Sequence, residues 1–379
     1  MENLLVNKVA AVKEVRQAAE YQKKKQACIL TGLAGSSKPV FFAAADKLLG
    51  GKGSMAFVTA SREEIRTYRR ELNYLYPDLP MQELYPVSLP RVQADTQSLE
   101  LQAGRAAALR FLSGEERGIV FITAEALQQK QLRPSGMSGK ALQLAVGEEH
   151  EQRNIAAALL DLGYERTEQV DALGQFCLRG DILDVYPINS SAAVRIEWFD
   201  NELDAMRSFD VDTQRSLQTL TSIKIAPLKV DESFSYDADI FEYCAADTMV
   251  VVDEPVHVFS MLEKLDKENK EHASELFNKQ ELIEQLAANG AVLVSALGHS
   301  YLQQLPSLNI PVRAVAPYNK NTNLLVEDLQ NWLAEGITPL IMLSGSIKAR
   351  GFADNLRNYG LKGHFCLLYT SDAADDLTR

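Results

Sequence analysis

A glycine-rich segment between an apolar strand and a helix constrains the fold of this chain most strongly. Residues 27–30 form a short apolar run, and Gly-Leu-Ala-Gly-Ser-Ser-Lys-Pro follows at positions 32–39. A strand, a glycine-rich turn and a helix in this order are typical of a P-loop, which reads Gly-x-x-x-x-Gly-Lys-Ser/Thr. Gly32 and Lys38 have the required spacing. The segment therefore predicts an α/β domain whose first strand ends at this loop.

Two substitutions make the loop degenerate. Ser37 stands where a P-loop has its second glycine, two residues after Gly35, and Pro39 stands where it has a hydroxyl side chain. Serine enters the left-handed backbone region at a cost, and proline supplies neither a magnesium ligand nor a backbone N–H. We therefore expect no tight binding of magnesium nucleotide and no catalytic residue in this loop.

The second half of an ATPase site would be an apolar strand that ends in acidic residues. Residues 248–252 are such a strand, and Asp253 and Glu254 follow it. An acidic pair also occurs at the carboxyl edge of many α/β sheets without any function. The two half-matches favour a relic of an ATPase fold, and an active ATPase that uses Lys38 with Asp253 and Glu254 remains the alternative.

Repeated strand and helix signals predict a parallel sheet with helices on its faces. Further apolar strands are expected at 55–59 and 118–122, the first followed by the capping box Ser61-x-x-Glu64. We expect this α/β domain to occupy residues 1–135 and 209–305. Between them, residues 136–208 contain a helix and short alternating segments, which predict a β-rich inserted α+β domain.

The chain after residue 305 has a different texture. We expect a linker and an incomplete small α/β domain over 306–366, with helices at 324–334 and 347–359 and a strand at 337–343. Residues 367–379 continue no pattern, and we interpret them as a truncation or assembly scar, with an ordinary frayed acidic terminus as the alternative.

Composition excludes some classes of function. The net charge of −12 disfavours non-specific binding to nucleic acid, although the basic residues at 23–25 and Arg66, Arg69 and Arg70 leave DNA binding as an alternative. No run approaches the ~20 apolar residues of a membrane span, and no secretory signal is seen, so a cytoplasmic location is expected. The 4 cysteines and 5 histidines are scattered, which predicts no metal site.

Several longer segments carry a family resemblance. They are the degenerate loop at 32–39, Glu-Leu-Tyr-Pro at 83–86, Phe-Cys-Leu-Arg-Gly-Asp-Ile-Leu-Asp-Val-Tyr-Pro at 176–187, Arg-Ile-Glu-Trp-Phe-Asp at 195–200 and Phe-Asp-Val-Asp-Thr-Gln-Arg-Ser at 209–216. Over about residues 5–366 the chain resembles the N-terminal part of the bacterial transcription-repair coupling factors, which is similar in turn to the excision-nuclease subunit UvrB.

The resemblance implies a UvrB-like module that neither hydrolyses ATP nor carries the DNA-clamping hairpin. It also implies that the β-rich insertion binds UvrA and recruits it to stalled RNA polymerase in nucleotide excision repair. The contact arginines of UvrB and its relatives then correspond to Arg166 and Arg179, whereas a third expected arginine is Cys177 here. Solvated surface charge is the alternative interpretation of both arginines. Tyr186 and Phe199 could flank the patch, but core packing is the stronger expectation for both.

The complete family protein continues with a polymerase-interacting domain and two motor domains, which this sequence does not contain. The resemblance therefore implies that RNA polymerase and double-stranded DNA are contacted through those missing domains. ATP and magnesium would belong to the motor, so no cofactor is expected in this chain. No membrane partner is expected either.

Overall fold

The computed structural model describes residues 4–89, 99–134, 141–228, 236–296 and 304–362, apart from 313–314, 316–317, 320, 340, 342 and 344. The expected scar at 367–379 lies outside the described residues. The chain divides into two compact units, residues 10–311 and residues 312–379 with residues 1–9.

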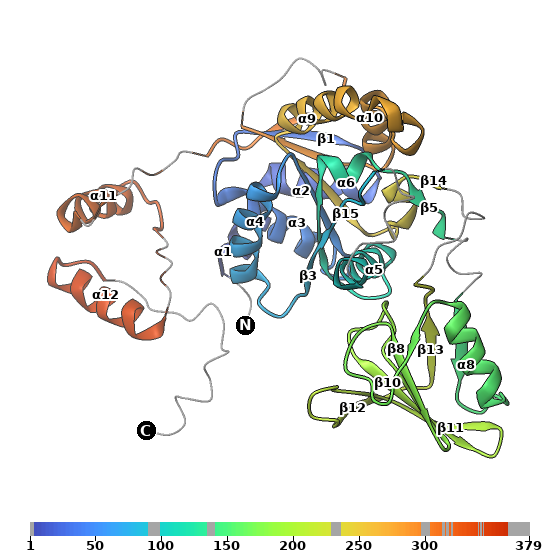
Figure 1. Cartoon of the computed structure of the whole chain (residues 1–379). Coiled ribbons are helices and arrows are strands. Elements are labelled where there is room, and N and C mark those ends of the chain that lie inside the picture. The colour runs from blue at the N-terminus through green and yellow to red at the C-terminus, as the bar shows by residue number, and fades with distance from the viewer. Residues whose placement is uncertain are drawn as a thin grey trace. The chain divides into compact units, whose positions relative to one another are not determined.

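A seven-stranded parallel sheet forms the centre of the larger unit, as the strand and helix pattern predicted (Figure 1). All its pairings are parallel. In spatial order its strands are β17 (Ser307–Asn309), β1 (Cys28–Thr31), β16 (Val292–Ser295), β15 (Met249–Asp253), β2 (Met55–Thr59), β4 (Ile119–Thr123) and β3 (Met81–Leu84). The inner strands are buried along their whole length because helices cover both faces.

One face of this sheet is covered by α2 (Lys13–Lys23), α3 (Ser37–Leu48) and α4 (Arg62–Leu75). Aromatic rings fill the interface, where Phe42 and Phe57 meet edge-to-face with centroids 5.0 Å apart and Tyr68 packs against both. The expected capping box of Ser61 and Glu64 starts α4. Helix α3 begins at Ser37, so Pro39 is its third residue and lies within the first turn, whose N–H groups have no acceptor inside the helix.

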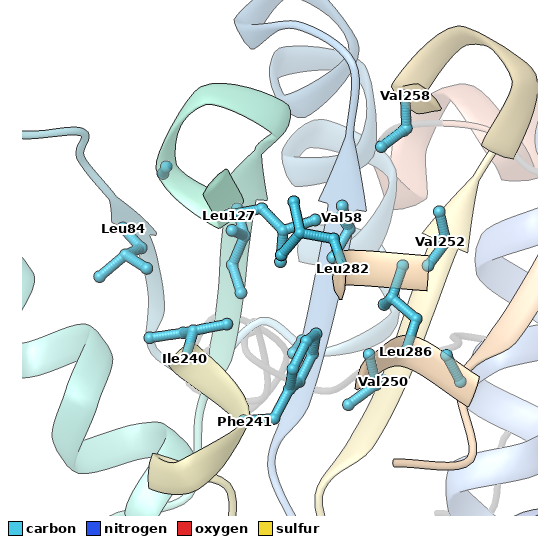
Figure 2. Close-up of a cluster of buried hydrophobic side chains, with 14 of the residues drawn as sticks. Val58, Leu84, Leu127, Ile240, Phe241, Val250, Val252, Val258, Leu282 and Leu286 are labelled. Atoms are coloured by element: carbon cyan, nitrogen blue, oxygen red, sulfur yellow. The ribbon is translucent and has the colours of Figure 1, made fainter. Parts of the chain in front are cut away.

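The other face carries α5 (Leu99–Ser113), α6 (Ala124–Gln128), α9 (Pro255–Glu268), α10 (Lys279–Ala288) and the 3-10 helices η2 (Ile240–Tyr243) and η3 (Lys270–Glu275). Figure 2 shows the core between these helices and the sheet, where Val58, Val250 and Val252 from the strands meet Leu127, Leu282 and Leu286 from the helices. Because residues alternate along β2, Val58 enters this core while Phe57 faces the aromatic side. The sheet is therefore wound on both faces.

An inserted domain leaves the α/β domain after β5 (Gln131–Leu132) and returns at β14 (Tyr236–Ala238). These two strands pair antiparallel, and Arg133 forms a bidentate ion pair with Asp237 at 2.8 and 3.1 Å. The ribbon thus joins the two chain segments that lead into and out of the insertion.

The insertion contains a six-stranded sheet with α8 (Gln152–Asp161) packed on one side. Its strands are, in order, β12 (Ser216–Thr219), β11 (Glu202–Phe209), β10 (Ala193–Phe199), β9 (Ile182–Val185), β8 (Gln175–Arg179) and β7 (Glu165–Arg166). Only β7 and β8 run parallel. A second pair, β6 (Leu142–Ala145) with β13 (Ser222–Ile225), completes the domain. Its separate core includes Phe176, Leu183 and Trp198.

The end of the insertion differs from the expected boundary at residue 208. Strand β11 crosses that position, and β12 and β13 follow it within the inserted domain. The sequence pattern did not reveal this because all four residues of β12 are exposed and carry no alternation of apolar and polar side chains. The segment expected as a linker from residue 306 likewise begins with β17, which pairs with β1 at the sheet edge.

The smaller unit contains helices at both of its chain segments: α1 (Leu4–Ala10), which continues into the larger unit by one residue, α11 (Thr322–Ala334) and α12 (Ser346–Asn358). Val326, Leu329, Leu356 and Leu361 form a small core there. At the described positions of 337–343 no strand is assigned. The two expected helices are confirmed.

Candidate nucleotide loop and candidate docking face

The first glycine of the loop makes room for a neighbouring strand. Gly32 has a φ of +86°, and a Cβ placed on it would lie 2.6 Å from the carbonyl oxygen of Ile310. This carbonyl belongs to the chain leaving β17, whose Ile310 N–H donates to Thr31 at 2.8 Å. Gly32 is therefore required by the packing of β17 against the loop.

The backbone N–H groups that a P-loop aims at phosphate are used inside this loop. The N–H of Ser37 donates to the carbonyl of Ala34 at 3.3 Å, and that of Lys38 donates to Gly35 at 3.2 Å. The N–H of Ala34 donates to the Ser37 hydroxyl at 3.0 Å. Pro39 has no N–H. Three N–H groups of the loop are thus bonded within it, and Pro39 lacks the hydroxyl that a P-loop offers to magnesium.

Lys38 is paired within the protein. Its Nζ lies 2.6 Å from Oδ1 of Asp253 and 2.9 Å from Oε1 of Glu254. Lys38 and Asp253 are both buried. Burial alone would lower the pKa of Lys38, but Asp253 and then Glu254 outweigh it and hold that pKa above its ordinary value. The structure therefore unites the loop with the acidic strand end, as the two half-matches predicted.

Glu254 is committed to the same network. Its φ of +41° places a non-glycine residue in the left-handed region. Its carboxylate accepts the N–H of Ala296 at 3.0 and 3.3 Å and the Ser295 hydroxyl at 3.4 Å, in addition to Lys38. A carboxylate with both oxygens occupied in this way is poorly placed to activate a water molecule.

Tyr68 also borders this network, which the sequence did not indicate. It comes from the buried side of α4, and its pKa is raised by burial and then by Asp253. Only the tertiary fold brings α4 to the end of β15. Among the described residues, no group of three or more His, Cys, Asp or Glu side chains is arranged to hold a metal ion.

The second candidate site is the side of the inserted sheet that faces away from α8. The register aligns Arg179 with Ile182 and Ile182 with Glu197, so these three side chains form one row across β8, β9 and β10. Arg195 and Phe199 lie on the same face because they alternate with Ile196 and Trp198 of the core. We call this surface, defined by Arg179, Ile182, Glu197 and Phe199, the open face.

Ion pairs occupy most of the charge on the open face. Arg195 binds Asp184 through two hydrogen bonds of 2.6 and 2.8 Å and lies over the ring of Phe209. Arg207 pairs with Glu197. Arg179 is exposed and donates only to the sulfur of Cys177, at 3.2 Å, with no carboxylate partner among the described residues. Its charge is therefore available to a binding partner.

Arg166 does not share the open face with Arg179. It is exposed on β7, the edge strand, where the register aligns it with Phe176 of the α8-side core. Residues aligned across a parallel pair point to the same side of a sheet. The two arginines singled out from the sequence thus belong to opposite sides of the sheet, although both are accessible.

The expectation that Phe199 packs in the core is wrong. Core packing was the stronger expectation, yet Phe199 is 78% exposed. It follows Trp198, which fills the core position of β10, so alternation sends Phe199 to the open face. Tyr186 is partly buried and packs against the small cluster of Cys177, Ala193 and Phe209, in agreement with core packing.

The basic residues considered for DNA binding are partly engaged. Arg69 donates to the carbonyl of Met81 at 3.0 Å and lies over the ring of Phe121. Arg66 and Arg70 are exposed on α4, and the lysines at 23–25 are exposed at the end of α2. Within the described residues, no helix is long and apolar enough to cross a membrane.

Comparison with known proteins identifies the inserted domain. Residues 142–230 match the UvrB interaction domain family. These bounds enclose every strand from β6 to β13, so the matched region is the inserted domain. The family match therefore coincides with a structural unit that has its own core.

The chain is also similar to proteins named transcription-repair-coupling factor. It is 36% identical over 203 residues to that of Bacillus subtilis (strain 168), which covers 53% of this chain and 17% of the relative. It is 31% identical over 202 residues to that of Staphylococcus haemolyticus (strain JCSC1435), which covers 53% of this chain and 17% of the relative. It is 28% identical over 165 residues to that of Escherichia coli (strain K12), which covers 44% of this chain and 14% of the relative. The resemblance to transcription-repair coupling factors is confirmed. The chain covers less than a fifth of the length of each of these relatives.

Homology to transcription-repair coupling factors leaves the roles of single residues to be argued from geometry. Sequence reasoning found Lys38, Asp253, Glu254 and Arg179, and the structure places the first three in contact. It missed Ser295 and Ala296, because their approach to Glu254 depends on β16 lying beside β15. The exposure of Phe199 had a readable signal in the alternation of residues 194–199.

Proposed function

We propose that this chain is a UvrB-like scaffold in transcription-repair coupling that binds UvrA and thereby recruits it to stalled RNA polymerase in nucleotide excision repair. The observation that carries the proposal is the match of residues 142–230 to the UvrB interaction domain, over the bounds of a separately cored domain. The α/β domain then serves as the frame from which the insertion projects through the β5–β14 ribbon.

Arg179 is the contact residue that the geometry favours. It is exposed, and the other arginines of the open face are already paired with carboxylates. An unpaired arginine can form bidentate hydrogen bonds with a partner carboxylate. Arg166 is accessible at the sheet edge and is the second proposed contact, on a different side of the sheet.

Binding of the whole 379-residue chain to purified UvrA can be measured by calorimetry. We expect wild-type chain to bind and Arg179→Ala to weaken binding by about tenfold or more. Arg70→Ala is the matched control, because Arg70 is exposed on α4 of the α/β domain, outside the inserted domain. Equal affinity of wild type, Arg166→Ala and Arg179→Ala would reject both site assignments, and absence of binding by wild type would reject the function.

We propose further that the chain does not hydrolyse ATP. The hydrogen bonds within the loop, Pro39 and the pairing of Lys38 with two carboxylates support this. The competing activity, an ATPase that uses Lys38, Asp253 and Glu254, is favoured by their contact in the structure. Magnesium-dependent ATP turnover that disappears in Lys38→Ala would establish the competing activity, whereas turnover equal to a buffer control supports the scaffold.

RNA polymerase and double-stranded DNA are proposed as partners of the longer relatives, and we assign neither to a surface of this chain. Arg69 is engaged with Met81 and Phe121, which removes it from the basic stretch on α4. If the chain bound duplex DNA with a salt-dependent affinity, and an Arg66→Ala, Arg70→Ala double variant bound it more weakly, α4 would be a DNA-binding surface of this chain.

A further inference from the structure

Phe199 is an aromatic side chain left uncovered at the end of a core strand. It is 78% exposed, and it is the one exposed phenylalanine in the described part of the chain. Single exposed aliphatic residues are ordinary on protein surfaces. A phenylalanine ring that is mostly in water is less ordinary, because aromatic residues contribute most of the apolar area buried in cores and interfaces.

Phe199 has apolar and charged neighbours that suit an interface. Ile182 is 38% exposed and pairs across the strands with Glu197, two residues before Phe199 on the same side of β10. Arg179 is the next member of that row. An aromatic residue, an aliphatic residue and an unpaired arginine therefore lie on adjoining strands, and aromatic residues and arginine are enriched at energetic hot spots.

Three hydrogen bonds hold the backbone on either side of Phe199 in place. The indole N–H of Trp198 donates to the carbonyl of His150 at 2.9 Å, and the Trp198 backbone N–H donates to Asp181 at 2.9 Å. The N–H of Leu203, across the hairpin, donates to Glu148 at 2.9 Å. Because this backbone is already ordered, a partner that binds Phe199 does not have to order it, which favours association.

We propose that Phe199, supported by Ile182, is the apolar anchor of the UvrA-binding face that contains Arg179; this proposal rests on the proposed function. The complementary surface has an apolar recess that receives the ring and a carboxylate within reach of Arg179. The ion pairs of Arg195 with Asp184 and of Arg207 with Glu197 leave Arg179 as the unpaired positive charge of the open face. Charge and apolar area together therefore define one partner surface.

Four variants test the anchor against wild type by calorimetry with purified UvrA. Phe199→Ala is expected to weaken binding by about thirtyfold or more, and Ile182→Ala by a smaller factor. Phe199→Tyr retains the ring and is expected to stay within about threefold of wild type. Tyr74→Ala is the matched control, because Tyr74 is 58% exposed on α4 of the α/β domain, outside the inserted domain. It is expected to leave the affinity unchanged.

The outcomes separate this inference from the function on which it rests. If wild type binds UvrA, Arg179→Ala weakens it and Phe199→Ala does not, the anchor is rejected and the function stands. If wild type does not bind, the function itself fails. Sedimentation of each variant alone adds one further arm: loss of a wild-type self-association in Phe199→Ala, at unchanged UvrA affinity, would assign the open face to a second copy of the chain and overturn the proposal.

Discussion

The ammonium group of Lys38 lies 2.6 Å from the carboxylate of Asp253, across the end of the parallel sheet. Both side chains are about nine-tenths buried, and Glu254 completes the group at 2.9 Å. The lysine that a P-loop directs to phosphate instead joins α3 to the ends of β15 and β16. This lysine and its two carboxylates therefore act as an internal connection of the fold.

Removing the lysine should destabilise the chain. Lys38→Met leaves Asp253 buried without its cation, and breaking a buried pair in this way costs about 3–5 kcal/mol. The free energy of unfolding, measured by urea denaturation, should fall by that order. Lys13→Met, at an exposed position on α2, is the control and should change it by less than about 0.5 kcal/mol. Equal stability of the two variants would contradict the connecting role.

The same pair predicts a dependence on alkaline pH. The pKa of Lys38 is higher in the folded than in the unfolded chain, where it is about 10.4. The folded state therefore holds this proton more tightly, and the stabilisation is complete below about pH 10 and lost as pH rises through the folded pKa. The difference in unfolding free energy between wild type and Lys38→Met should be constant near neutral pH and shrink above about pH 10.5. Both proteins retain the buried Tyr68, whose pKa is also raised. A difference that grows with pH would have the wrong sign.

Gly32 and Gly35 should respond differently to alanine. Both have positive φ, which costs an L-residue about 1–2 kcal/mol. A Cβ on Gly35 meets no atom within 4 Å, whereas one on Gly32 meets the Ile310 carbonyl at 2.6 Å. Gly32→Ala should therefore destabilise by at least about 1 kcal/mol more than Gly35→Ala, as overpacking does. Thermal or urea unfolding of both variants checks this, and the reverse order would indicate that β17 does not pack on the loop.

Gln129 holds the chain that follows β3. Its buried amide accepts the N–H of Val87 and donates to the carbonyl of Val87, both at 2.7 Å. Gln129→Leu leaves both backbone groups without these partners, at about 1–3 kcal/mol for each group that stays buried. Hydrogen exchange at the Val87 amide should accelerate more than exchange in β2 or β4. Gln280→Leu, at an exposed position of α10, is the control and should alter neither.

Local sequence patterns predict most of the element types and much of their order. The apolar run at 55–59 is β2 with the same bounds, because continuous burial leaves a clear local signal. Local patterns also singled out Lys38, Asp253 and Glu254, through the spacing of the loop and the acidic pair after β15. The family resemblance followed from local segments as well.

The contacts that these residues make depend on the tertiary structure. The contact between Lys38 and Asp253 joins positions 215 residues apart, and Glu254 meets Ala296 only because β16 lies beside β15. Strands β12 and β17 were not predicted because each is short, mostly exposed and hydrogen-bonded to neighbours that the sequence does not name. Strand β13 does alternate polar and apolar residues, and that signal was missed. The sequence alone places Arg166 and Arg179 in one contact patch, whereas the strand register places their side chains on opposite sides of the sheet. The same register turned Phe199 outward, because Trp198 already fills the core position beside it.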